Sequence, residues 1–180
     1  MKLSDRAPMT TTAHAVAFHA AGHAVVAHLV GFPVQSASML RPCKLHSRGH
    51  GPLGRSDFDA HAAAVLGGAV AESVISGRPV EVILHRGMGH DDLDTLTADI
   101  RYVFLPDERA DAFLKAVEHT VALVMQPGVW PTIVTVAGLL LSDGVVSDIE
   151  LVAVLAIFTG PERQVALTSL PPSTGQPEAR

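Results

Sequence analysis

The sequence predicts a mainly α-helical domain with a small β-sheet, an α+β fold. Its 180 residues suit one domain with a core of its own. Six segments combine helix-forming residues with a capping residue or with a Gly or Pro at the end. The clearest strand signal is segment 34–40, which alternates weakly in polarity between Pro33 and Pro42.

The first half of the chain contains two predicted helices around this strand. Residues 1–10 are polar and are expected to be flexible, and the domain is expected to span 11–160. A threonine cap at Thr11 or Thr12 precedes an Ala- and Val-rich helix over 13–30, which Gly31 ends. Residues 41–56 are rich in Gly and Pro and predict a loop, with room for a short strand near Leu53. The second helix is predicted over 57–75.

Two glycines lie inside the second predicted helix. Gly67 and Gly68 each cost about 1 kcal/mol of helix stability relative to alanine. Such a pair indicates that another backbone packs very close to the helix at this point.

The second half is predicted to be almost entirely helical. A short edge strand over 80–84 and a loop over 85–90 precede helices over 91–103, 107–125, 132–141 and 148–158. From Pro161 onward the chain is rich in Pro, Ser, Gly and charge, so 161–180 is expected to be a disordered tail.

Composition excludes several classes of function. The formal charge is −5 with no basic run, which gives nucleic-acid binding no electrostatic support. A single cysteine, Cys43, excludes disulfide frameworks and Cys-rich zinc sites within one chain. The sequence has no run of about 18 apolar residues and no signal-peptide layout, so a cytoplasmic protein is expected. The ten histidines mean that a bound metal would be held by imidazole and carboxylate, as zinc or iron can be.

One histidine pair carries possible metal chemistry. His19 and His23 are four residues apart on the first predicted helix, so both imidazoles face the same side. Two imidazoles at this spacing can share one Zn²⁺. In the His-Glu-x-x-His pattern of metallopeptidases the glutamate is the general base, and here Ala20 occupies that position. Spacing alone fits two ordinary histidines on an Ala-rich helix equally well.

Three motifs in order resemble one family. Residues 19–24, HAAGHA, resemble the HEAGHA signature of the protease domain of FtsH, the membrane-bound AAA protease. Residues 65–72, VLGGAVAE, resemble that family's LGGRAAE helix, and residues 89–93, GHDDL, resemble its AxNDL segment. The resemblance covers about residues 12–158. The AAA module and the transmembrane segments of the family have no counterpart in the sequence.

The resemblance implies an FtsH-like zinc metallopeptidase, a bacterial-type hydrolase. His19, His23 and Asp92 match the zinc ligands of the family. Glu72 matches an acid expected to accept the free N–H of a ligand histidine and so to fix its tautomer. Alternatively, Glu72 lies on the solvent-facing side of its helix. The alternative role for Asp92 is that of a helix cap.

Three acidic or basic neighbours of Asp92 are auxiliary candidates. Asp91 is the adjacent alternative ligand and Asp94 a remote one, whereas His90 is close enough in sequence to reach the site. The resemblance also implies a peptide or protein substrate that pairs with strand 34–40. A homo-oligomer is possible, since the family forms rings.

Ala20 departs from the family at its catalytic position. A methyl group cannot take a proton, and losing a general base costs orders of magnitude in rate. Three explanations stay open. The glutamate was replaced deliberately to trap an inactive enzyme, the chain is a natural pseudo-peptidase that binds peptide or protein without cutting, or the scaffold runs a different zinc reaction. In the last case His90, Asp91 or Glu72 would supply the base.

Overall fold

The computed structural model describes residues 12–32, 34–40 and 53–168. These residues form a mainly helical α+β fold with a two-stranded sheet, as the sequence predicts. The elements in chain order are α1 (Thr12–Leu29), β1 (Ser36–Ser38), α2 (Arg55–Ser76), α3 (Val80–Arg86), α4 (His90–Val103), α5 (Arg109–Val124), α6 (Val129–Asp143), β2 (Val145–Ser147) and α7 (Asp148–Thr168).

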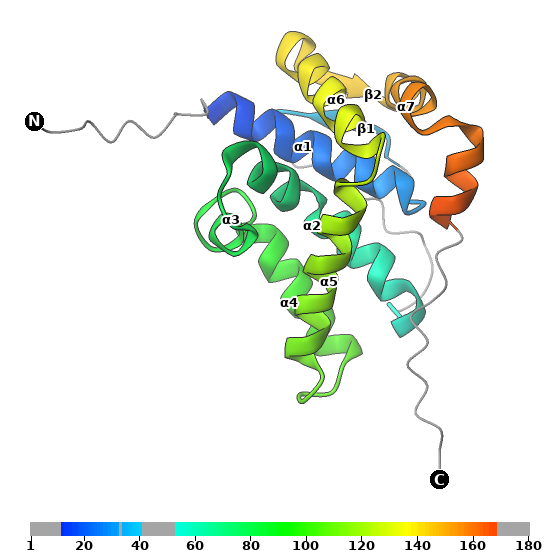
Figure 1. The fold of residues 1–180 in the computed structure, drawn as a ribbon. Helices are drawn as coiled ribbons and strands as arrows, with labels where there is room; N and C mark the ends of the chain where they lie inside the picture. Colours follow the sequence, from blue (N-terminus) through cyan, green and yellow to red (C-terminus); the bar gives the residue numbers. More distant parts are fainter. Residues whose placement is uncertain (1–11, 33, 41–52, 169–180) are drawn as a thin grey trace, which may run out of the picture.

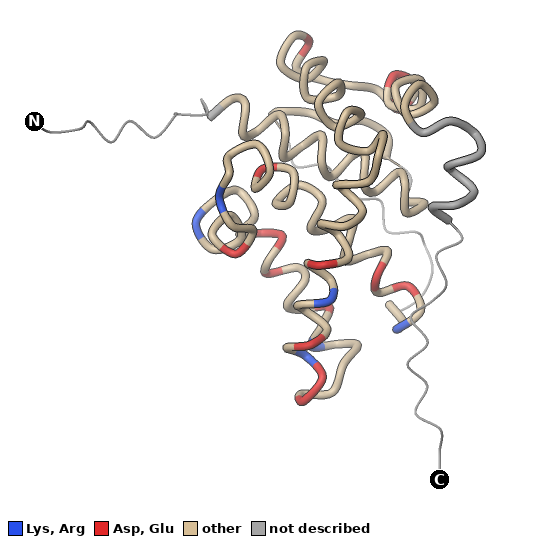
Figure 2. The backbone as a smooth tube through the Cα atoms, viewed as in Figure 1, with Lys and Arg blue, Asp and Glu red and all other residues tan. Residues whose placement is uncertain are grey.

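Helix α1 lies in the middle of the fold, packed against α2 and α6 (Figure 1). It contains no Lys, Arg, Asp or Glu, and Figure 2 shows that the charged side chains gather mainly elsewhere, many of them on α3 to α5. Ala21, Ala24 and Val25 are fully buried. An uncharged central helix with small side chains lets its neighbours approach closely, so His19 and His23, which it carries, are buried as well.

Helices α1 and α2 touch through two glycines. A Cβ atom on Gly22 would lie 2.3 Å from the carbonyl oxygen of Gly67, and one on Gly67 would lie 2.7 Å from the carbonyl oxygen of Gly22. Both distances are far inside van der Waals contact. The prediction that the glycine pair of α2 marks a close backbone approach is therefore confirmed, and the partner is α1.

The small sheet joins distant parts of the chain. β1 and β2 pair antiparallel, with Ser36 opposite Ser147, Ala37 opposite Val146 and Ser38 opposite Val145. Ala37 and Val146 face the core and are each 1% exposed. The predicted strand 34–40 is thus shorter than expected. β2, its partner, follows Gly144 at a place where the sequence predicts only a turn.

The prediction of an edge strand over 80–84 is wrong, because these residues form helix α3. The amides of Val82 and Ile83 donate to the carbonyl oxygen of Pro79, which starts the helix. Ile83 and Leu84 are fully buried, whereas the flanking Glu81 and His85 are exposed. Helical burial on one side overrides the β-branched composition that favoured a strand.

Helix α7 continues beyond the end that Pro161 predicts, to Thr168. Residues 162–167, ERQVAL, are mostly good helix formers, which explains the extension. The remaining predicted tail, the predicted flexible segment 1–10 and most of the loop 41–56 lie outside the described residues. Leu53 is not in a strand.

One described helix, α2, is long and apolar enough to cross a membrane by length and composition alone. Helices α5 and α6 together would meet the same test if they were one span bent by 80°. In α2, 67% of the apolar window is buried inside the protein. Core helices pass this test too, and the packing of α2 against α1 accounts for its composition.

Candidate metal centre

Two histidines of α1 face each other across one helical turn. Their Nε2 atoms are 3.0 Å apart, and the rings meet edge to face with centroids 4.7 Å apart. Each residue is 8% exposed. The four-residue spacing of His19 and His23 places both side chains on the same face of α1, as the sequence predicts.

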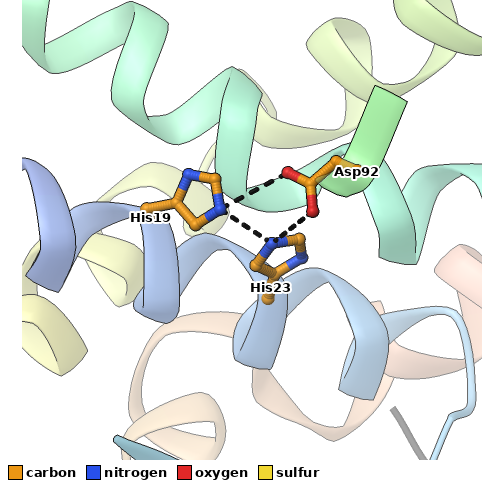
Figure 3. Close-up of side chains that lie close together, drawn as sticks. All are labelled: His19, His23 and Asp92. Atoms are coloured by element: carbon orange, nitrogen blue, oxygen red, sulfur yellow. Dashed lines mark hydrogen bonds and ion pairs between the residues drawn. The ribbon is translucent and has the colours of Figure 1, made fainter. Parts of the chain in front are cut away.

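Asp92 approaches this pair from the first turn of α4 (Figure 3). Its Oδ2 atom lies 3.4 Å from His19 Nε2, and its Oδ1 atom lies 3.3 Å from His23 Nε2. With metal–ligand bonds of about 2.0–2.1 Å, two corners of a tetrahedral site are about 3.3 Å apart. The two Nε2 atoms and the carboxylate oxygens nearest to them are therefore spaced like ligands of one ion, and the group His19, His23 and Asp92 could hold a metal.

The outer nitrogens of both rings are held by acceptors. His19 Nδ1 lies 3.2 Å from Glu72 Oε2, and His23 Nδ1 lies 3.0 Å from the carbonyl oxygen of Ala64. A carbonyl oxygen or an ionised carboxylate can only accept, so Nδ1 carries the proton in each ring. In the neutral tautomers the Nε2 lone pairs then point at each other and at the carboxylate of Asp92.

Such a cluster of lone pairs needs a positive charge at its centre. Burial by itself lowers the pKa of His19, but hydrogen bonds to Asp92 and Glu72 and their charges outweigh burial and raise this pKa to about 9. Burial raises the pKa of Asp92, but the two histidines outweigh it and lower this pKa to about 2. In the metal-free protein a proton on His19 therefore supplies the charge.

A proton does not satisfy the whole site. The buried Oδ2 of Asp92 makes no hydrogen bond of good geometry with the described residues, and its contact with His19 Nε2 is 3.4 Å long. Such an orphaned buried oxygen is uncommon and calls for an explanation, of which an ion is one. A divalent cation would contact both Nε2 atoms and this carboxylate together, so the residues present fit a metal on observations of their own.

Gly68 provides the space that the rings occupy. A Cβ at this position would lie 2.4 Å from His23 Nε2 and 2.8 Å from His19 Cδ2. Of the two glycines that the sequence singles out in α2, Gly67 therefore admits the backbone of α1 and Gly68 admits its histidines.

The three ligand candidates open into a pocket of about 490 Å³. Ala20, at the position that the resemblance assigns to the general base, is among the residues that line it. Of the auxiliary candidates, Asp91 also lines the pocket. His90 is exposed, pairs with Asp94 at 3.5 Å and is not among the lining residues. The structure therefore brings Asp91 near the site and leaves His90 and Asp94 on the surface.

One pocket residue has no motif that points to it. His61, on α2, lines the pocket and lies with its Nε2 atom 2.9 Å from Asp99 Oδ2. Its sequence signal is its spacing from the glycine pair, since residues 61, 65, 68 and 72 fall on one helix face. That face is the one against the metal ligands.

No known protein-family model matches the chain, and a search of curated proteins finds no match. The resemblance to FtsH therefore rests on the three sequence motifs.

Proposed function

We propose that this protein binds Zn²⁺ through His19, His23 and Asp92 on the scaffold of an FtsH-like metallopeptidase, and that Ala20 leaves its peptide hydrolysis impaired. The observation that carries the proposal is the convergence of two Nε2 atoms and one carboxylate, with both Nδ1 atoms already held by acceptors. This arrangement directs both imidazole lone pairs toward one point.

The donor set suits zinc. Two imidazoles and one carboxylate are the protein ligands of many catalytic zinc sites, in which a further position stays open to water or substrate. The same set also occurs in iron(II) sites. The contacts of 3.0 to 3.4 Å among the two Nε2 atoms and the Asp92 carboxylate, together with the motif resemblance, favour zinc.

Zn²⁺ held by His19, His23 and Asp92 would supply Lewis-acid chemistry toward a peptide carbonyl. The chain's own residues hold and orient this centre: Glu72 and Ala64 fix the tautomers, and the walls of the pocket enclose it. Among the described residues, position 20 is the one that the resemblance assigns to the general base, and alanine cannot fill that role. Asp91 lines the pocket, but it is exposed to water.

A second candidate function follows from Ala20. With metal ligands and pocket intact and the base absent, the protein would capture an extended peptide without cutting it, as a pseudo-peptidase does. Both candidates share the metal centre and differ in turnover.

Two measurements test the proposal. Elemental analysis of the purified protein should find about one zinc per chain, and the double variant His19→Ala/His23→Ala should lose it. Ala20→Glu should raise zinc-dependent cleavage of a mixed peptide library by about 10²- to 10⁴-fold, the usual contribution of a general base. A chelator should abolish that gain.

The outcomes separate the possibilities. Iron in place of zinc would overturn the assignment of the metal. A zinc-loaded Ala20→Glu protein that cuts no peptide would overturn the peptidase scaffold. Peptide binding by the unaltered chain with no turnover would favour the pseudo-peptidase.

A further inference from the structure

Another histidine of the pocket, His61, is paired with a carboxylate, that of Asp99. His61 Nε2 lies 2.9 Å from Asp99 Oδ2, and the two side chains are 23% and 25% exposed. The ring of Phe32 packs edge-on against His61 with centroids 5.7 Å apart. By contrast, the pair His90–Asp94 is 3.5 Å apart and mostly exposed. The His61–Asp99 pair is thus shorter, shielded and fixed in orientation.

Helix geometry places this pair about two helical turns away from the metal centre. On α2, His61 precedes Gly68, which faces the ligand histidines, by seven residues. On α4, Asp99 follows Asp92 by seven residues. Seven residues of α-helix correspond to about 10 Å, and two full turns keep the side chains on one face. The pair therefore lies about 10 Å along both helices from the metal ligands.

This separation rules out one role for His61. A general base must come within about 3 Å of the proton that it takes, or reach it through one water. At about 10 Å, His61 cannot replace the glutamate missing at position 20. It is placed to bind a part of the ligand that lies away from the reacting carbonyl.

The hydrogen bond to Asp99 decides what His61 offers a ligand. An ionised carboxylate can only accept, so His61 Nε2 donates and the neutral ring keeps its lone pair on Nδ1. No hydrogen bond from another described residue reaches Nδ1. Toward the described residues, Nδ1 is therefore an available acceptor, and its complement is an N–H donor on the ligand.

We propose that His61, positioned by Asp99, binds the terminal amino group of a peptide whose carbonyl group, about three residues further on, faces the metal centre. An extended chain advances about 3.3 Å per residue, so three residues cover the 10 Å. The carboxylate of Asp99 favours an ammonium over a neutral amide. Apolar side chains also line the pocket, namely Val16, Met39, Val65 and Met88. This inference rests on the proposed function and adds the substrate class.

Binding of peptide hydroxamates to the zinc-loaded full chain tests the inference. A tripeptide hydroxamate places its chelating group on the metal and its amino terminus near His61. By calorimetry at pH 7, the form with a free amino terminus should bind at least about tenfold tighter than the acetylated form, the scale of one charge-assisted hydrogen bond. A six-residue hydroxamate is too long to place its amino terminus at His61 while its chelating group is on the metal. It should bind equally well with a free or an acetylated amino terminus.

Variants test whether His61 causes the preference for a free amino terminus. His61→Ala should bring the ratio of the two affinities close to 1. Asp99→Asn should lower it at least fivefold, because an amide can donate as well as accept and no longer fixes the proton on Nε2. His85→Ala, on the exposed side of α3, should leave the ratio unchanged. Circular dichroism and zinc content, measured for each variant, should match the unaltered protein.

Each contrary result has its own meaning. A ratio near 1 in the unaltered protein, or a ratio that survives His61→Ala, overturns the role of His61 while zinc binding stands. Zinc-loaded protein that binds neither hydroxamate overturns it as well. Protein that holds no metal overturns the proposed function and this inference together.

Discussion

Gly68 faces His23 so closely that a Cβ atom on this glycine would lie 2.4 Å from the Nε2 atom of the imidazole. Nε2 is the atom through which His23 would bind a metal. The glycine therefore acts on the site directly, although it has no side chain and no chemistry of its own. Its neighbour Gly67 faces the backbone of α1. One glycine of the pair therefore leaves room for the histidine rings and the other for the backbone of α1.

Gly68→Ala should weaken zinc binding by about 100-fold or more. The added methyl group would overlap both imidazoles, and displaced ligands lose the spacing that one ion requires. The measurement is competition for zinc against a chromophoric chelator. Alanine favours a helix over glycine by about 1 kcal/mol, so the fold itself is not expected to suffer from lost helix propensity.

Gly138→Ala, on α6, is the matched control. A Cβ at Gly138 meets no atom within 4 Å, and the residue is exposed. This variant should gain up to about 1 kcal/mol of stability and keep its zinc affinity. Equal zinc affinity in both variants would contradict the assigned role of Gly68.

Glu72→Gln should lower zinc affinity by about 10- to 100-fold, the usual effect of losing a carboxylate behind a ligand histidine. The glutamine keeps the size of the side chain and can still accept the Nδ1 proton of His19, but it lacks the negative charge that supports the ligand. Zinc competition and thermal melting of the zinc-loaded protein report the change.

Glu81→Gln on the exposed face of α3 removes the same charge away from the site. It should leave zinc affinity within about twofold, since exposed charges are screened. An equal loss in both variants would mean that net charge, and not the contact with His19, sets the affinity.

The residues of the metal centre were predictable because short motifs carry them. The four-residue spacing of His19 and His23 fixes a shared helix face, and the resemblance adds Asp92 from a helix 69 residues further on. The pair His61–Asp99 was not predictable in this way. Its partners belong to no motif, and their meeting depends on how α2 packs against α4.

The same limit explains the errors in secondary structure. Local composition favoured a strand over 80–84, but burial of Ile83 and Leu84 on one side of a short helix decided the outcome. Strand β2 is three residues long and exists through its pairing with β1. Long-range packing, which a single sequence does not display, determines both.

Raising the pH should destabilise the metal-free protein between about pH 6.5 and pH 9. The folded-state pKa of His19 is raised from 6.5 to about 9 because Asp92 and Glu72 outweigh its burial. A raised pKa contributes stability that is fully present below pH 6.5 and is lost as the pH rises through 9. Urea unfolding of chelator-treated protein across this pH range measures the free energy of unfolding. In the variant His19→Gln, this free energy should fall less as the pH rises.

Zinc binding should show the opposite dependence. A metal requires the lone pair of His19 Nε2, so zinc displaces the proton and its affinity should rise with pH up to about 9. Calorimetry at pH 7.5 in two buffers of different ionisation enthalpy should find close to one proton released per zinc from His19. No proton release at this pH would show that His19 is already neutral without the metal.

Gly22→Ala should destabilise the whole protein, not the metal centre alone. Its Cβ would lie 2.3 Å from the carbonyl oxygen of Gly67 and 2.7 Å from the Cβ of Ala71, so α1 and α2 would have to move apart. Overpacking of a core usually costs about 1–3 kcal/mol, and a clash with a backbone atom belongs at the upper end. Denaturant unfolding of the metal-free protein measures this cost without any contribution from zinc. Gly138→Ala again serves as the control, and a Gly22→Ala protein as stable as the unaltered chain would show that the two helices do not need their closest contact.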